Sequence, residues 1–318
     1  MKYIKYFLQF IFAIITFIIF KFLGPNLSSN LSGKLFEFIG PFFRSKVIIN
    51  SNIKKAIPNI QENELNKIKK LMWNNYGRIF AEYIFIKDFR EGKLSSNIEV
   101  NGKEILDKII NSNQQVVFVS GHLSNFELMA MYLEKSGVKL SAIYRPLNNI
   151  FLNQIMERIR KKYICKMQIK KGIGGLKKLI SLKKKNYSTA LMIDQRVSEG
   201  ILSNFFSQKA LTTTIPAQLV KKYNIPVVAI YIERFKGTNF KITINEPINF
   251  PKNSSVQYIT DKLNKILEEM IMNKPEQWIQ HFIPDDVIDV SRWADHKERV
   301  LNGVASAHQL IAEHTESA

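Results

Sequence analysis

The run from Tyr6 to Phe20 constrains this chain most, because it carries no charged side chain and is almost wholly apolar. Two lysines precede it and Lys21 follows it. With Phe22 and Leu23 included and Lys21 reaching back to the interface, the stretch lies at the short end of the roughly 17 to 25 residues that cross a bilayer. The pattern therefore predicts a helix that spans a membrane or lies in its interface.

We expect residues 1–24 to be a retained anchor and not a cleaved signal. No small-x-small cleavage site follows the apolar run, and Gly24-Pro25-Asn26 is a helix stop instead. Lysines on both flanks leave the orientation of the anchor open.

Composition limits the rest of the chain. Its 318 residues, 46% hydrophobic, suffice for one large core. The formal charge of +19 should attract anions such as nucleic acid, lipid headgroups or acidic carrier proteins, and charge alone does not choose among them. No nucleic-acid-binding module is recognisable, so we expect no nucleic acid partner. A single cysteine, Cys165, excludes an internal disulfide framework and suits a reducing cytosol.

Apolar residues recur at helical spacing from Glu62 to about Phe89, which predicts a helical collar between membrane and core. After Asn101, short β-rich runs alternate with helical stretches. The expected strands are 116–120, 140–144, 188–193, 227–232 and 240–244, and the expected helices are 125–135, 149–162, 176–185, 217–223 and 256–272. This alternation predicts an α/β fold with a sheet flanked by helices, over residues 25–283. Residues 284–318 have a different composition and are expected to form an atypical tail.

One segment carries candidate chemistry: His122 directly follows a buried strand, and Glu127 comes five residues later. Open α/β sheets place their chemistry at the carboxyl ends of strands. Gly121 allows a tight turn, and Ser124 with Glu127 has the spacing of a capping box that starts a helix. This geometry would let Glu127 orient His122 as a general base for an acceptor hydroxyl. The alternative is that Glu127 only caps the helix and His122 is an ordinary loop residue.

Further motifs follow in a fixed order. They are Tyr144-Arg145-Pro146, Asn153 with Arg158 and Arg160, Asp194-Gln195, Phe205-Phe206, Thr212-Thr213-Thr214 and Pro275-Glu276-Gln277-Trp278. Together with the anchor and the His122 to Glu127 motif, this order resembles the lipid A late acyltransferase branch of the lysophospholipid acyltransferase superfamily. The resemblance runs from the anchor to about Trp278.

The resemblance implies a function and its partners. His122 would be the general base and Glu127 its partner, in an acyltransferase-like mixed sheet. The acyl donor would be a thioester on acyl carrier protein, and the acceptor a hydroxyl of a Kdo-bearing lipid A precursor. The enzyme would need no cofactor and would sit at the bacterial inner membrane with its catalytic domain on the cytoplasmic side. No metal site is expected, because a His-Glu pair supplies too few ligands and the other histidines lie far along the chain.

The resemblance also places Arg158 and Arg160 near the acceptor, where a guanidinium suits a phosphate or an oxyanion. A solvated basic helix face is the alternative for both. Arg145 is expected in the same cleft or in an ion pair.

Two other pairs of candidate positions have structural alternatives. Asp194 and Gln195 end an apolar strand, where a carboxylate could position Arg158 or an acceptor hydroxyl, or cap a turn. Thr212 and Thr213 precede a helix and would cap it or bind an anion there.

Some positions depart from the family pattern. Ser207 stands where a Gly is usual and Leu211 where an Ala is usual, and the sequence after Gln280 loses the family's aromatic and Arg-rich run. Other functions stay open: acylation of a lysophospholipid or a mannosylated lipid, or a membrane-tethered binder of anionic lipid without catalysis.

Overall fold

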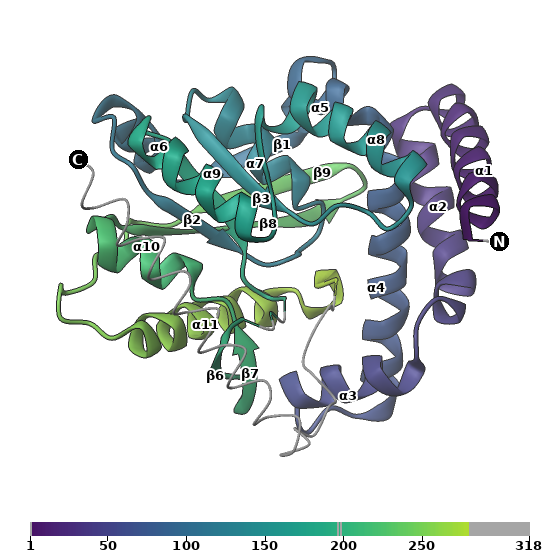
Figure 1. The fold of residues 1–318 in the computed structure, drawn as a ribbon. Coiled ribbons are helices and arrows are strands. Elements are labelled where there is room, and N and C mark those ends of the chain that lie inside the picture. The colour runs from purple at the N-terminus through teal and green to yellow at the C-terminus, as the bar shows by residue number, and fades with distance from the viewer. Residues whose placement is uncertain (1, 196, 198, 280–318) are drawn as a thin grey trace.

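The computed structural model describes residues 2–195, 197 and 199–279. In this part of the chain, seven strands form one sheet in the order β1-β9-β8-β2-β5-β3-β4. Their bounds are β1 Ile98–Asn101, β2 Val117–Ser120, β3 Leu140–Tyr144, β4 Met167–Lys170, β5 Ser188–Met192, β8 Val227–Lys236 and β9 Asn239–Ile244. All neighbouring pairs are parallel except β8 and β9. The expected α/β fold with a mixed sheet is confirmed (Figure 1).

Helices cover both faces of the sheet (Figure 1). They are α5 Ile86–Glu91, α6 Lys103–Asn111, α7 Glu127–Lys135, α8 Ile150–Ile159, α9 Ile173–Lys184, α10 Ile215–Tyr223 and α11 Val256–Asn273, and a π-helical turn, Arg160–Ile164, continues α8. Successive side chains of a strand point to opposite faces. Accordingly, Phe118 packs into one core with α6 and α7, whereas Val117 and Val119 pack into the other with α10 and α11.

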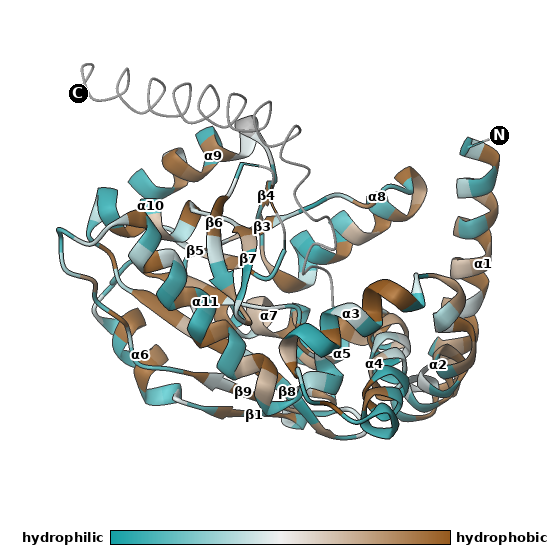
Figure 2. Ribbon diagram, turned by 90° about the horizontal axis from the view of Figure 1, so that it is seen from below, coloured by the Kyte–Doolittle hydropathy of each residue, from teal (hydrophilic) through white to brown (hydrophobic). Residues whose placement is uncertain are grey.

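An N-terminal helical layer stands beside the sheet (Figure 2). It consists of α1 Lys2–Leu23, α2 Pro25–Ile39, α3 Lys46–Ala56 and α4 Glu62–Glu82. By length and composition, α1 could cross a membrane. Helix α4 is the collar helix that the periodicity of apolar residues predicted. Three of these apolar residues, Leu65, Ile68 and Met72, are buried. Helices α2 and α3 were not expected from the sequence.

The five expected strands are present with small shifts at their ends, and four others were missed. Two of these, β1 and β4, are four-residue edge strands with charged or polar positions. The other two, β6 Ile201–Phe205 and β7 Gln208–Thr212, form a separate hairpin that packs on α11. The expected boundary between main domain and tail at 283/284 lies outside the described residues.

Candidate active site

His122 lies just past the carboxyl end of β2, at the edge where the parallel strands β2, β5 and β3 all end. The preceding Gly121 is closely packed. A Cβ there would lie 2.8 Å from Cδ1 of Leu267 and 3.3 Å from Oδ2 of Asp194. A side chain at residue 121 would therefore require the Leu267 side chain to shift and would crowd Asp194, which follows β5.

Asp194 holds His122 by two hydrogen bonds. The ring Nδ1 of His122 is 2.6 Å from Oδ1, and its backbone N–H donates to Oδ2 at 2.7 Å. The indole Nε1 of Trp278 also donates to Oδ2, at 3.1 Å. Burial acts to raise the pKa of Asp194, but the charge and hydrogen bonds of His122 outweigh it and leave the pKa below its ordinary value. Asp194 is thus a buried carboxylate shared by His122 and Trp278.

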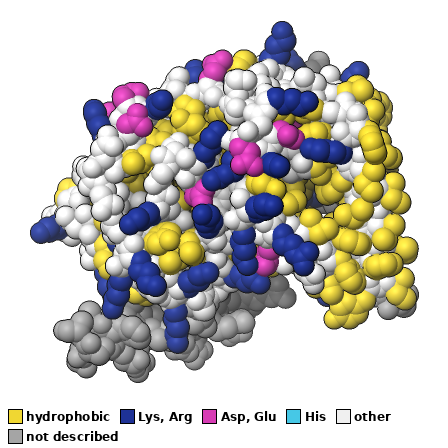
Figure 3. Space-filling model, turned by 90° about the horizontal axis from the view of Figure 1, so that it is seen from above, with side chains coloured by type: hydrophobic (Ala, Val, Ile, Leu, Met, Phe, Trp, Pro, Cys, Tyr) yellow, Lys and Arg dark blue, Asp and Glu magenta, His cyan; other side chains and the backbone are white. Residues whose placement is uncertain are grey.

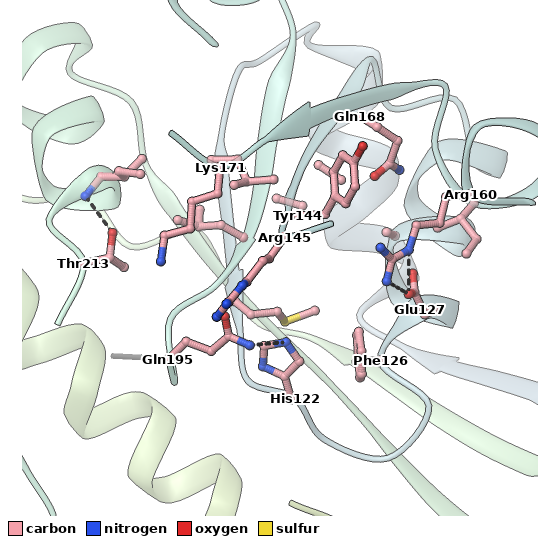
Figure 4. A pocket seen from close by; sticks show the side chains of 18 of the residues that line it. His122, Phe126, Glu127, Tyr144, Arg145, Arg160, Gln168, Lys171, Gln195 and Thr213 are labelled. Atoms are coloured by element: carbon pink, nitrogen blue, oxygen red, sulfur yellow. Dashed lines mark hydrogen bonds and ion pairs between the residues drawn. The ribbon is translucent and has the colours of Figure 1, made fainter. Parts of the chain in front are cut away.

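The other ring nitrogen of His122 points toward a cavity (Figure 4). Its Nε2 is 3.2 Å from the side-chain nitrogen of Gln195. One tautomer fits both contacts: Nδ1–H donates to Asp194, and Nε2 accepts from the amide of Gln195. Nε2 is then the atom available to take a proton. The ring also stands edge-on to Phe126, with centroids 4.7 Å apart.

Glu127 has a different partner from the one expected. Its carboxylate accepts two hydrogen bonds from Arg160, one of them from Nε at 2.9 Å (Figure 4). The expectation that Glu127 accepts the His122 ring proton is therefore wrong in this structure, since Asp194 occupies that place. Burial acts to lower the pKa of Arg160, but the negative charge of Glu127 and its hydrogen bonds with the guanidinium act against burial, and the pKa is raised. The pair is a fixed ion pair of the cavity wall.

The expected capping box is also absent from the described residues. Helix α7 begins at Glu127, and Phe126 precedes it without a side-chain cap. Ser124 has a positive φ of 46°, and its buried hydroxyl has no hydrogen-bond partner among the described residues. The loop is closed instead by the segment after α11, because Ser124 N–H donates to Gln277 O at 2.8 Å and Ile279 N–H to His122 O at 2.9 Å. This segment therefore shapes the turn that carries His122.

The N-terminal collar reaches the same loop through Glu82, at the end of α4. This carboxylate is fully buried and accepts hydrogen bonds from Arg234, from Ser29 at 2.8 Å and from Asn125 at 3.0 Å. Asn125 lies between His122 and Glu127. A charged network thus ties α2, α4 and β8 to the loop of the candidate site.

The cavity beside His122 has a volume of about 190 Å³ and a largely apolar wall. Small and apolar residues of α7, β3 and β5 line it: Ala130, Ala142, Ile143, Ala190, Leu191 and Met192. The guanidinium of Arg160 lies 5.5 Å from the ring centroid of Tyr144. Arg145 and Lys171 are exposed lining residues. The site therefore joins an apolar pocket to two exposed cations.

Not every predicted site residue reaches this cavity. Arg145, Arg160, Gln195 and Thr213 line it together with His122 and Glu127. Arg158 is exposed on α8 and does not line it. Thr212 is buried outside the lining and accepts a hydrogen bond from Asn264 at 3.1 Å. Thr213 accepts one from Ile215 N–H at 3.4 Å, at the start of α10 (Figure 4).

Sequence reasoning missed Lys171 and the hydrogen bond from Trp278 to Asp194. The contact between Asp194 and His122 could have been predicted from the order of the strands, because neighbouring parallel strands end at the same edge of a sheet. Among the described residues, no group of three or more His, Cys, Asp or Glu could hold a metal ion.

The fold and the site define an α/β protein in which a histidine–aspartate pair at the carboxyl edge of the sheet faces an apolar cavity. The model of one family, bacterial lipid A biosynthesis acyltransferase, matches residues 1–281. The chain belongs to this family of acyltransferases.

Similar proteins include lipid A biosynthesis acyltransferase 2 of Shigella flexneri, 24% identical over 59% of this chain, and the lipid A biosynthesis myristoyltransferase of Escherichia coli K12, 21% identical over 81% of this chain. The match spans 60% of the Shigella protein, less than two thirds of it, and 79% of the Escherichia protein. A solved structure, the 1-acyl-sn-glycerophosphate (LPA) acyltransferase PlsC from Thermotoga maritima, aligns with a TM-score of 0.39 and 17% identity over 78% of this chain and 97% of that one.

Proposed function

We propose that this protein transfers a fatty acyl chain from acyl carrier protein to a hydroxyl of a Kdo-bearing lipid A precursor, at the cytoplasmic face of the inner membrane. The observation that carries the proposal is the His122–Asp194 pair, in which Asp194 bonds Nδ1 of the ring while His122 lines the cavity. The family supports acyl transfer in lipid A synthesis. The donor, the Kdo group and the membrane face are parts of the proposal.

In the proposed reaction, Nε2 of His122 takes the proton of the acceptor hydroxyl. At the same time the hydroxyl oxygen attacks the carbonyl carbon of the thioester. The tetrahedral intermediate collapses when the carbon–sulfur bond breaks, and the thiolate receives the proton from the imidazolium. One ester and one thiol result, so atoms and charges balance. Asp194 stabilises the imidazolium and fixes the ring, and such a base contributes typically about 10²–10⁴-fold to the rate.

The remaining candidates take binding roles in this proposal. The apolar wall beside the Glu127–Arg160 pair suits a hydrocarbon chain. Arg145 and Lys171 suit the phosphate groups of the acceptor. Two effects lower the pKa of Lys171, partial desolvation and then the charge of Arg145, with Glu199 opposing them. Two cations close enough to affect each other are favourable for a multiply charged anion.

Acyl transfer by membrane fractions tests the function. Fractions containing wild type or His122→Ala receive labelled acyl carrier protein thioesters together with a Kdo-bearing tetraacyl precursor, the same precursor without Kdo, or a lysophospholipid. We expect label in the Kdo-bearing lipid with wild type only. Label moving to the lysophospholipid instead would overturn the acceptor. A parallel incubation supplies coenzyme A thioesters in place of the carrier protein thioesters, and transfer from these alone would overturn the donor.

A further inference from the structure

Helix α2 is amphipathic in the opposite sense from a helix that packs in water. Its buried side, which packs on α4 and on the end of α1, carries small and polar residues, Ser28, Ser29, Ser32 and Gly33. Its outer side carries large apolar residues that are exposed, Leu27 (49%), Leu31 (45%), Leu35 (49%) and Phe38 (74%). A soluble helix turns its apolar stripe inward. The arrangement of α2 is the one expected where the outer medium is apolar.

The contact between α2 and α4 is close along its buried centre, and charged side chains join the two helices beside it, with Arg78 donating to Ser29 at 3.1 Å. The backbones approach so closely that a Cβ on Gly77 would lie 2.3 Å from the carbonyl oxygen of Ser32. The serine hydroxyls bond across the contact, Ser32 to Gly77 O at 2.7 Å and Ser29 to Glu82 at 2.8 Å. Small residues with hydroxyl hydrogen bonds are the usual means of joining helices where burial of apolar surface gives no driving force.

Helix α1 lies along the globular domain and does not project from it. Near its start, Asn149 donates to Tyr6 O at 2.8 Å, and Phe7 contacts Phe151 with ring centroids 5.6 Å apart. Near its end, Lys21 bonds Asp88 at 3.0 Å. A rise of 1.5 Å per residue puts roughly 21 Å between Phe7 and Lys21. A spanning α1 would pull the polar residues of α8 and α5 into the hydrocarbon layer.

Exposed apolar side chains continue from α1 over α2 to the turn that follows it. The outer side of α1 exposes Leu8, Phe12 and Ile15, and the turn after α2 exposes Phe42 (88%) and Phe43 (68%). Figure 3 shows hydrophobic side chains gathered along the α1 edge of the molecule, with Lys and Arg beside them. Residues 2–56 contain eight Lys or Arg and a single Glu, so the charge around this surface is complementary to anionic lipid.

From these observations we infer that the chain is monotopic: α1, the outer side of α2 and the turn at Phe42–Phe43 enter one leaflet of an anionic membrane together, and α1 does not cross it. The inference rests on the membrane association in the proposed function and adds its geometry. Long apolar helices that lie in an interface with basic flanks behave in this way.

The topology can be measured with single cysteines in the full chain. The native Cys165 is buried, and burial raises the pKa of its thiol to about 12. This cysteine should therefore not react with maleimides in the folded protein. Lys2→Cys reports the start of α1, and Lys252→Cys reports an exposed site on the globular domain. In sealed vesicles of one orientation, an impermeant maleimide should label both or neither. Labelling of only one in intact vesicles, and of the other only after lysis, would show a spanning helix and overturn the inference.

The contribution of the turn is measured separately. An environment-sensitive fluorophore is attached to Phe42→Cys, or to Tyr258→Cys as a control on another exposed aromatic position. With vesicles containing phosphatidylglycerol and spin-labelled lipid, residue 42 should be quenched and residue 258 should not. Equal quenching at both positions, or none at residue 42, would overturn the inference. Neither readout needs activity, so an inactive chain with the expected labelling would refute only the proposed function.

Discussion

The carboxylate of Asp194 accepts hydrogen bonds from both the ring and the backbone of His122, although the two residues are 72 positions apart in the chain. This relationship assigns the role of orienting carboxylate to Asp194. Glu127 pairs with Arg160 instead. Substitution of Asp194 should therefore affect the rate of transfer, whereas substitution of Glu127 should mainly affect stability.

Replacement of Asp194 by Asn should lower kcat by about 10²–10⁴-fold, with a small change in KM. An amide cannot stabilise the imidazolium and can favour the wrong tautomer. Steady-state acyl transfer measures the effect, with Asp261→Asn as a control on a partly buried carboxylate outside the cavity lining, which accepts a hydrogen bond from Ser203. Unchanged kcat in Asp194→Asn would contradict the assignment.

Removal of one member of the Glu127–Arg160 pair should destabilise the protein by about 3–5 kcal/mol, because the other charge is left buried without a partner. Side-chain exposures of 9% for Glu127 and 12% for Arg160 justify treating the pair as buried. The double variant Glu127→Gln with Arg160→Met should recover part of the loss. Denaturant midpoints in detergent give the loss of stability of the two single variants and of the double variant. A loss in the double variant equal to the sum of the two single losses would contradict a direct pair.

The lowered pKa of the Asp194 carboxyl predicts that the free energy of unfolding depends on pH. Its pKa lies below the ordinary value of 3.8, so its contribution is present above pH 3.8 and is lost as the pH falls through the lower, folded-state value. The difference in unfolding free energy between wild type and Asp194→Asn should therefore shrink on strong acidification. A difference that grows on acidification would have the wrong sign.

Trp278→Phe keeps an aromatic ring in the core but removes the indole donor to Asp194. Hydrogen bonds to charged groups contribute about 1.5–3 kcal/mol, so this much stability should be lost. Trp73→Phe is a control, since Trp73 is buried in the collar cluster. An equal loss in both variants would indicate lost packing and not the lost hydrogen bond.

The sequence was sufficient for the parts of the fold that depend on local pattern. Buried strands such as β2 and β5 and the long helix α4 carry enough periodicity to be found. Edge strand β4 does not, because Met-Gln-Ile-Lys alternates over only four residues, too few to indicate a strand. Helix α2 was missed for a physical reason: its apolar residues face outward and its serines inward.

The sequence placed His122 after a buried strand, as the structure has it, but predicted only part of its contacts. A histidine after a buried strand indicates where chemistry occurs, but which carboxylate reaches it depends on strand order and on the turn at Gly121. The positive φ of Ser124 turns the chain so that the expected capping box does not form. Arg160 was expected at the acceptor and is held by Glu127, a contact set by the π-helical turn that no spacing rule indicates.

The most direct test of the central claim is the single-turnover rate of acyl transfer to the Kdo-bearing precursor by His122→Ala, compared with wild type and with Glu127→Gln, each confirmed as folded in the membrane. If His122 is the base and Asp194 its partner, His122→Ala should lose about 10²–10⁴-fold in rate and Glu127→Gln should lose less per folded molecule. A folded His122→Ala that transfers at the wild-type rate would contradict the account.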